Sequence, residues 1–201
     1  MSRENENEGR GLPWLRFACV GLLVALDLWS KHAVFAWLSQ PMQALVDSGV
    51  EYWTTEQLAA WRYPLLGDFL GFLLSENKGA AWGLGDSVPW VLVGARIAAS
   101  IVLVVLLWRA PAGQPWTRAA LVLILAGALG NLWDNLTRSP PPGHPFGAVR
   151  DFIHVYFESF GYHFPTFNVA DSCITVGAAI LIVGGLFGSR EERSEADAEP
   201  A

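Results

Sequence analysis

Four long apolar stretches alternate along the chain with segments rich in polar residues, proline and glycine. The apolar stretches cover residues 12–38, 88–108, 119–136 and 169–187. A helix of about 20 apolar residues crosses the roughly 30 Å hydrocarbon core of a bilayer, so each stretch is close to or above spanning length. The pattern predicts an α-helical membrane protein with four transmembrane helices.

The composition agrees with this prediction. Apolar residues make up 52% of the 201 residues and charged residues only 16%, against roughly 25% charged residues in soluble domains. The formal net charge of −6 comes largely from the two ends. We expect residues 1–11 and 189–201 to be disordered tails because they hold too little apolar surface to fold. Residues 12–188 then form one membrane domain, and no nucleic-acid partner is expected.

The distribution of lysine and arginine predicts the orientation, because these residues are enriched on the cytoplasmic side of membrane proteins. With four spans both termini share one side, which holds seven basic residues: Arg3, Arg10, Arg16, Arg109, Arg118, Arg190 and Arg193. The other side holds four: Arg62, Lys78, Arg138 and Arg150. Lys31 and Arg96 fall inside spans. We therefore expect cytoplasmic termini, with residues 39–87 and 137–168 outside the cytoplasm.

The two outer segments differ in character. Residues 39–87 are too rich in aromatic residues for a solvated loop and are expected to lie on the membrane surface. Within them FLGFLLSENKGAAWGL, residues 69–84, predicts one or two short strands with a glycine turn. Residues 137–168 begin with the cluster SPPPGHPFG, residues 139–147, which is incompatible with a helix or a central strand.

Asp27 and Lys31 lie inside the first span, four residues apart and on one helix face. Pairing allows both groups to stay charged at membrane depth, where an unpaired charge costs at least about 2.5 kcal/mol. The main interpretation is a structural ion pair that fixes helix packing. A catalytic role is the alternative.

Two further motifs carry polar groups. Asn77, Lys78 and Gly79 open a stretch of small residues that allows close approach of a peptide or strand, although a plain turn explains it equally well. Asn131 and Asp134 share a face at the end of the third span, where they suit hydrogen bonding to a substrate or to catalytic groups. Simple capping of the helix end is the alternative.

Two aspartates flank the last outer segment. Asp151 precedes a short amphipathic piece, and Asp171 begins the fourth span together with Asn168, three residues earlier. Two carboxyl groups that share a site do not ionise together easily, so one keeps its proton near neutral pH. One carboxylate then activates a water as general base while the protonated group polarises a scissile carbonyl. The pair predicts an aspartyl protease dyad.

The order of these motifs resembles that of the bacterial lipoprotein signal peptidases, also called signal peptidase II. The matching pieces are LDLWSK at 26–31, NKGAAWG at 77–83, GALGNLWD at 127–134, VRDF at 149–152 and FNVADSCITVG at 167–177. Each piece alone is a weak signal. Five in the family's order, separated by the predicted spans, are a strong one.

The resemblance implies a four-helix intramembrane aspartyl protease of the inner membrane, with a small extracytoplasmic β-cradle and a short extracytoplasmic helix before the fourth span. It implies cleavage of diacylglyceryl-modified prolipoproteins before the lipidated cysteine. By motif position the catalytic residues are Asp151 and Asp171. The supporting or substrate-binding residues are Asn77, Gly79, Asn131, Asp134 and Asn168, and the first-helix pair is Asp27 and Lys31. The expected partners are the prolipoprotein and membrane lipid, with the chain acting as a monomer. Neither a metal nor another cofactor is implied.

Two positions depart from the family pattern. The family usually has arginine directly after the third-helix aspartate, where this chain has Asn135. We expect Arg138 or Arg150 to replace that cation. The segment at 139–147 also lengthens the stretch between Asp134 and Asp151.

Two other functions fit the intramembrane acids. A small proton-coupled transporter or channel would use Asp27, Asp134, Asp151 and Asp171 as a relay. The chain lacks the paired broken helices in matching halves that transporters often have. A lipid-headgroup transferase with an aspartate-bound metal would place its acids on the cytoplasmic side, whereas these are predicted outside.

Overall fold

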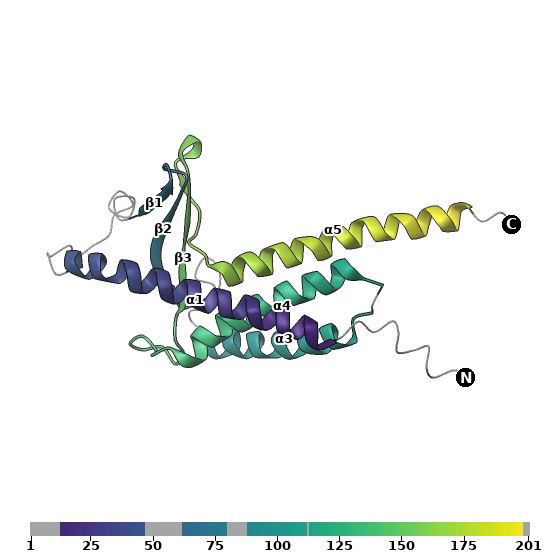
Figure 1. Cartoon of the computed structure of the whole chain (residues 1–201), viewed down its shortest axis with the longest axis horizontal. Coiled ribbons are helices and arrows are strands. Elements are labelled where there is room, and N and C mark those ends of the chain that lie inside the picture. Colours follow the sequence, from purple (N-terminus) through teal and green to yellow (C-terminus); the bar gives the residue numbers. More distant parts are fainter. Residues whose placement is uncertain (1–12, 47–61, 80–87, 112, 199–201) are drawn as a thin grey trace.

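We describe the protein from a computed structural model, which places residues 13–46, 62–79, 88–111 and 113–198. Its long helices are α1 (Pro13–Val46), α3 (Pro89–Arg109), α4 (Pro115–Thr137) and α5 (Val169–Ala198). The start of α1, the connection from α3 to α4 and the end of α5 lie towards one end of the molecule, and a small sheet lies towards the other (Figure 1).

The four predicted apolar stretches all lie on helices. Among the described residues, three helical segments are long and apolar enough to cross a membrane: Trp14–Ser39, Pro89–Arg109 and Pro115–Thr137. The apolar part of α5 is shorter, Val169–Gly185. The chain is therefore a multi-pass membrane protein. The third helix begins before the predicted residue 119, because the fixed φ of proline suits the first position of a helix and Pro115 stands there.

The last helix extends beyond its apolar part. Its backbone remains helical to Ala198, through most of the segment for which the sequence predicts a disordered tail. Residues 188–198, GSREERSEADA, are rich in glutamate, arginine and alanine, which favour helix even without apolar surface to bury. The other predicted tail, residues 1–11, lies outside the described residues.

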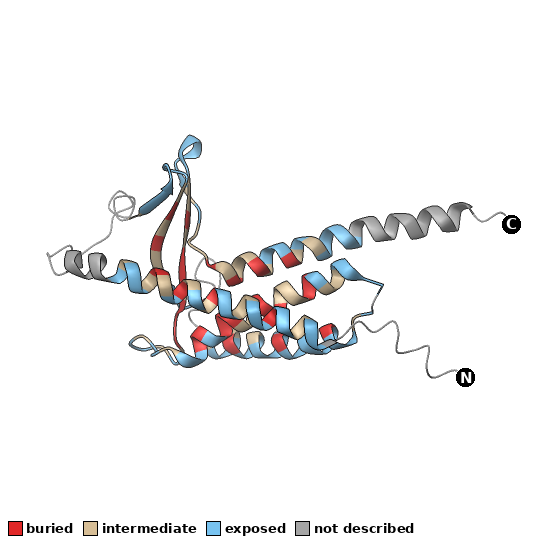
Figure 2. Ribbon diagram, viewed as in Figure 1, coloured by how far each residue is buried: buried red, intermediate tan, exposed pale blue. Residues whose placement is uncertain are grey.

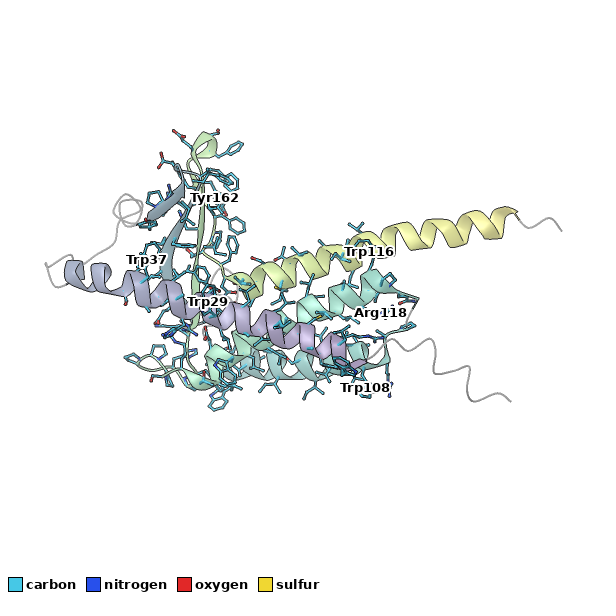
Figure 3. All side chains as sticks on the ribbon, in the orientation of Figure 1. Trp29, Trp37, Trp108, Trp116, Arg118 and Tyr162 are labelled. Carbon is cyan, nitrogen blue, oxygen red and sulfur yellow. The ribbon has the colours of Figure 1, made fainter. Side chains whose placement is uncertain are left out.

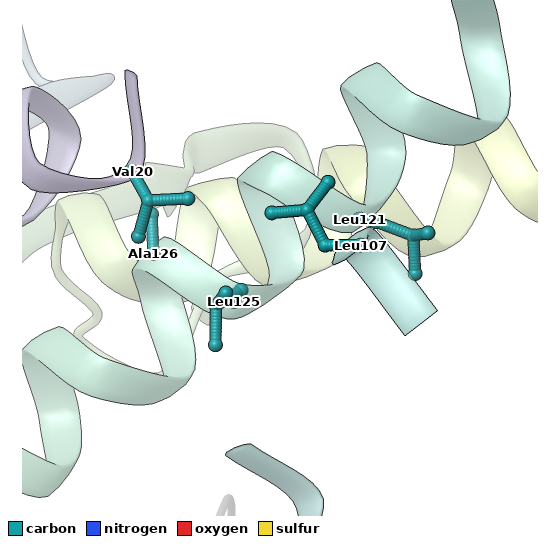
Figure 4. Packing of buried hydrophobic residues seen from close by; sticks show 5 residues of the cluster. All are labelled: Val20, Leu107, Leu121, Leu125 and Ala126. Carbon is teal, nitrogen blue, oxygen red and sulfur yellow. The ribbon is translucent and has the colours of Figure 1, made fainter. Parts of the chain in front are cut away.

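Helix α4 is the centre of the bundle and packs against α1, α3 and α5. Buried residues gather on the faces that the helices turn towards one another, while the outer faces are exposed (Figure 2). The main apolar cluster joins three helices through Val20, Leu107, Leu121, Leu125 and Ala126 (Figure 4). Many large apolar side chains on the outer faces are exposed, as expected where helices meet lipid.

Helices α4 and α5 approach closely through glycine. A Cβ atom on Gly127 would lie 2.3 Å from the backbone oxygen of Ala170. One on Gly177 would lie 2.8 Å from the backbone oxygen of Ala120. Because a glycine on each helix meets the backbone of the other, the two helices pack at a distance that side chains would prevent.

The sheet has four antiparallel strands in the order β1-β2-β3-β4. Strands β1 (Tyr63–Leu66) and β2 (Leu70–Asn77) form a hairpin, with Gly67 in its turn at a φ of +50°, a conformation that favours glycine. The strand predicted within residues 69–84 is thus confirmed by β2. Residues 47–61 and 80–87 of the same outer segment lie outside the described residues.

The second outer segment differs from the expectation of a short helix. Residues Val149–Phe157 form strand β3, which pairs with β2, and Tyr162–His163 form β4. The helical part of this segment is one 3-10 turn, Glu158–Phe160. The piece VRDFIHVYF is rich in β-branched and aromatic residues, which suit a half-buried pleated surface. The sheet therefore combines a hairpin from the first outer segment with strands from the second.

Exposed tryptophans mark both ends of the helical bundle (Figure 3). Trp108 and Trp116 lie at the end where α3 connects to α4, and Trp37 lies beside the sheet. The Trp37 ring packs edge-on against Tyr63 of β1, with ring centroids 4.6 Å apart. Tryptophans at both ends are typical of helices whose ends lie at the two membrane interfaces.

The close approach of α4 and α5 predicts that Gly127→Ala is destabilising. The added methyl group overlaps the α5 backbone, and such overpacking costs about 1–3 kcal/mol. Gly94→Ala on α3 is the matched control, because a Cβ there meets nothing within 4 Å. Denaturant-induced unfolding of both variants in detergent micelles measures the difference. Equal unfolding midpoints for Gly127→Ala and Gly94→Ala would contradict the packing.

Candidate active site

A buried lysine joins the helices beneath the sheet. The Lys31 side chain is fully buried, and its Nζ lies 2.8 Å from Oδ2 of Asp27 and 3.7 Å from Oδ2 of Asp134. The same Nζ donates a hydrogen bond of 2.9 Å to Oδ1 of Asn131. Lys31 of α1 thus binds two polar residues of α4, and the predicted structural ion pair of Asp27 and Lys31 is present.

The two aspartates that meet Lys31 connect the remaining elements. Asp27 accepts a hydrogen bond of 2.9 Å from the backbone N–H of Ala170, in the first turn of α5. Asp134 accepts three hydrogen bonds from Arg150 of β3, including one of 2.7 Å from Nη2 and one of 3.0 Å from the backbone N–H. Asp134 is fully buried. These contacts join α1, α4, α5 and β3 at a single point.

Asp171 and Asn168 form a capping box at the start of α5. The Asn168 side chain accepts a hydrogen bond of 2.9 Å from the backbone N–H of Asp171, and Asp171 accepts one of 3.1 Å from the backbone N–H of Asn168. Asn131 donates a further bond of 2.7 Å to Asp171. The Asp171 carboxylate thus accepts two hydrogen bonds at the N-terminal end of a helix, where the helix dipole attracts negative charge.

Asp151 lies on β3 and is almost completely buried. Its strand partner is Ser75 on β2, next to a register shift between Phe72 and Ser75. There three steps along β2 match two along β3, a bulge of the kind that redirects side chains near active sites. Asn168 donates a hydrogen bond of 2.6 Å to Asp151, and Asn77 provides a second.

Burial, followed by the negative charge of Asp171, raises the pKa of Asp151 to about 7. The hydrogen bonds from Asn168 and Asn77 act in the opposite direction, because they stabilise the charged form. Asp151 is therefore poised to carry a proton near neutral pH beside Asp171, which accepts two hydrogen bonds at the start of a helix. Such a pair suits general acid and base catalysis.

Both carboxyl groups face one cavity of about 570 Å³. Asn77, Arg96 and Asn131 also line it, and the apolar part of its wall includes Phe164, Phe167, Ile174 and Val176. Of the predicted supporting residues, Asn77 and Asn131 line this cavity. Asn168 and Asp134 are buried behind it, and Gly79 acts through its backbone, whose carbonyl accepts a hydrogen bond from Arg96.

No role for Arg96 was predicted from the sequence. Arg138 and Arg150, the expected replacements for the missing arginine, do not line the cavity. Arg150 pairs with Asp134, and Arg138 pairs with Glu76 at 2.7 Å. Arg96 instead brings a guanidinium from α3 to the cavity wall. The available signal was a lone arginine inside an apolar span, which usually marks a functional position.

The described residues contain no group of three or more His, Cys, Asp or Glu side chains placed to hold a metal ion. Cys19 is exposed and Cys173 is buried, and both are free thiols. The polar side chains that line this cavity carry carboxyl, amide, guanidinium and hydroxyl groups, the last from Thr166, Ser172 and Thr175.

Comparison with known proteins gives consistent matches along the chain. The model of the signal peptidase (SPase) II family matches residues 19–187. Proteins named lipoprotein signal peptidase from Yersinia pestis (strain Pestoides F) and Yersinia pseudotuberculosis serotype O:1b (strain IP 31758) are 36% and 35% identical over 188 residues, which is 92% of each chain.

Two solved structures of bacterial membrane enzymes share the fold. One at 2.3 Å resolution covers 96% of this chain and 98% of its own, with a TM-score of 0.67 and 24% identity. Another at 1.9 Å resolution covers 89% of this chain and 96% of its own, with a TM-score of 0.61 and 25% identity. The mostly helical architecture with a small antiparallel sheet is therefore shared with known enzymes.

The buried ion network predicts that Lys31→Met strongly destabilises the protein. The change leaves Asp27 and Asp134 buried without their ammonium partner, and breaking a buried pair in this way costs about 3–5 kcal/mol. Unfolding in detergent micelles measures the loss. His32→Gln, at the exposed neighbouring position, is the control and should unfold like the wild type. A Lys31→Met protein as stable as this control would show that the network contributes little.

Proposed function

The chain belongs to the signal peptidase II family, and on that premise we propose that it is an intramembrane aspartyl endopeptidase. Its substrates are diacylglyceryl-modified prolipoproteins, and it cuts the peptide bond before the lipidated cysteine. The single observation that carries the assignment is the pair Asp151 and Asp171, which come from a strand and a helix start and face the same cavity.

The proposed reaction uses the two carboxyl groups in different protonation states. Asp171, which accepts hydrogen bonds from Asn131 and from the Asn168 backbone, acts as the carboxylate that removes a proton from a water as that water attacks the scissile carbonyl carbon. Asp151 donates its proton to the carbonyl oxygen, which gives a neutral tetrahedral diol. Collapse of the diol breaks the C–N bond: Asp171 gives its proton to the leaving amine and Asp151 takes the proton of one hydroxyl, which restores the starting state of the dyad. The products are a carboxylic acid and a free amine, and no other reactant is needed.

The surroundings of the dyad support a lipid-modified peptide as substrate. The cavity of about 570 Å³ has an apolar part beside α5, suited to acyl chains or an apolar signal sequence. A second hollow of about 470 Å³ shares Asp151 and Asn77 and is lined by Ser75, Glu76 and Lys78. The dyad thus lies between an apolar and a polar space, which suits a bond between a membrane-embedded segment and a soluble one.

The proposal includes a location and an orientation. The protein lies in the bacterial cytoplasmic (inner) membrane with four spans, both termini in the cytoplasm and the sheet outside. The uneven distribution of basic residues supports this orientation. The start of α1 and the end of α5 lie towards the same end of the molecule, which suits termini on one side of the membrane (Figure 1). The chain acts as a monomer on membrane-bound substrates and needs no cofactor.

The alternative of a proton-coupled transporter or channel gains no support from the site. Asp27 and Asp134 are both bound to cations, Lys31 and Arg150. A relay requires groups that release and accept protons in sequence, and acids held in ion pairs suit that task poorly.

The dyad predicts that Asp151→Asn and Asp171→Asn each reduce cleavage by at least about a thousandfold, as is usual when one member of a catalytic unit is removed. The measurement is processing of a diacylglyceryl-modified prolipoprotein by purified protein in lipid. Asp68→Asn changes a carboxylate whose side chain is 82% exposed on the β1–β2 turn, and it should retain wild-type activity. Wild-type cleavage by either dyad variant would rule out this mechanism.

The raised pKa of Asp151 predicts a loss of activity in alkaline solution. Asp151 keeps its proton below about pH 7 and loses it above, so the acid needed for the first step disappears as pH rises. We expect kcat/KM to fall about tenfold per pH unit above the apparent pKa of the dyad. Initial rates between about pH 6 and pH 9 measure the profile, with circular dichroism as a check that the fold persists. A flat profile would contradict the assigned proton.

A further inference from the structure

Arg96 is a charged residue inside α3, and its guanidinium contacts two other elements. Nη1 donates a hydrogen bond to Oδ1 of Asn135 on α4. Nη2 donates one of 3.3 Å to the backbone carbonyl of Gly79, directly after β2. A planar fork with fixed donor directions can hold two acceptors at once, which a flexible ammonium does less well. Arg96 therefore joins α3, α4 and the end of β2.

The contact with Gly79 leads to Asp151 in two further steps. The backbone N–H of Gly79 donates a hydrogen bond of 3.0 Å to Oδ1 of Asn77, an Asx turn. The Asn77 side chain in turn hydrogen-bonds the Asp151 carboxyl. Because Arg96 holds the carbonyl of the residue that orients Asn77, the direction of the Asn77 amide depends on the guanidinium.

Asn135 gives Arg96 a rigid partner. Its Nδ2 donates a hydrogen bond of 2.7 Å to the Gly147 carbonyl, and its own backbone carbonyl accepts one of 3.0 Å from the Gly147 N–H. Gly147 ends the proline-rich segment at 139–147. A Cβ atom on Gly147 would lie 2.5 Å from the backbone carbonyl oxygen of Asp134. Asn135 is thus tied to this segment on one side and presents its Oδ1 to Arg96 on the other.

We propose that Arg96 is the positioning residue of this active site: through Gly79 it fixes Asn77 against Asp151, and Asn135 together with the proline-rich segment holds it in place. The inference rests on the proposed function only for its kinetic readout. The proline-rich segment and Asn135 then act together, because both help to hold the Arg96 guanidinium in place.

The arrangement also acts on the charge of the dyad. The charged groups that act on Asp151 include Asp171 from α5, Lys31 from α1 and Arg96 from α3, and Glu76 and Lys78 line a hollow that Asp151 shares. Removing Arg96 takes away one of these cations and releases the Asn77 bond that stabilises the carboxylate. Both changes favour the protonated form of Asp151, so its titration moves to higher pH.

The test compares wild type, Arg96→Gln, Asn77→Ala and the double variant. Activity is kcat/KM as a function of pH with a synthetic diacylglyceryl-modified peptide that spans the cleavage site. A ¹³C-carboxyl NMR titration of aspartate-labelled protein in micelles, assigned with Asp151→Asn, follows the Asp151 proton without any substrate. Arg109→Gln, at the exposed far end of the same helix, is the control and should match wild type in both measurements.

We expect Arg96→Gln to lower kcat/KM by about tenfold or more and to move the alkaline limb to higher pH by about half to one unit. In the Asn77→Ala background Arg96→Gln should lower kcat/KM by less than about threefold, because the path from Arg96 to Asp151 through Asn77 is already broken. Equal losses in both backgrounds, or a lower activity with an unmoved limb and an unmoved Asp151 titration, would overturn the inference. Absence of cleavage by the wild type would refute the proposed function alone, since the NMR titration still tests the contact.

Discussion

The structure depends on one buried ammonium group. Lys31 carries a full charge inside a helix bundle, and it is stable there because Asp27, Asp134 and Asn131 surround it. An isolated charge in such a place would be far too costly, so these partners are required and cannot be exchanged independently. Because they belong to different helices, and because Asp27 also reaches the first turn of α5, satisfying one charge fixes how the helices meet.

Residues of this network also position the two candidate catalytic carboxyl groups. Asn131 uses its oxygen to accept from Lys31 and its amide to donate to Asp171. Asn168 begins α5 and reaches Asp151. The two carboxyl groups also differ in their surroundings, since Asp171 lies at a helix N-terminus and accepts two hydrogen bonds, while Asp151 is buried on a strand. Burial and the neighbouring negative charge raise the pKa of Asp151.

The two features that were expected from the resemblance to depart from the family pattern meet at one place. Asn135 and the proline-rich segment look unrelated in the sequence. In the structure Asn135 hydrogen-bonds Gly147 of that segment and also Arg96. A guanidinium on α3 occupies the cavity wall near both aspartates. A cation can reach such a site from any neighbouring helix. The hydrogen bonds and charge interactions of a guanidinium depend on its distance and direction from its partners, whatever its position in the sequence.

Local patterns in the sequence were enough to predict the apolar helices, the strand β2, the pairing of Asp27 with Lys31 and several polar residues of the cavity. These features follow from local rules: apolar length, helical spacing and the cost of charge at membrane depth. The resemblance implied a short helix before the fourth span, whereas most of this outer segment is extended, and the β-branched and aromatic residues of Val149–Phe157 suit the strand that they form. The pairing of β3 with a sheet begun before α3, and the contacts of Arg96 with Gly79 and Asn135, became clear only from the folded structure. Contacts between residues distant in the chain depend on how helices cross and strands pair, and no local pattern of residues carries that information.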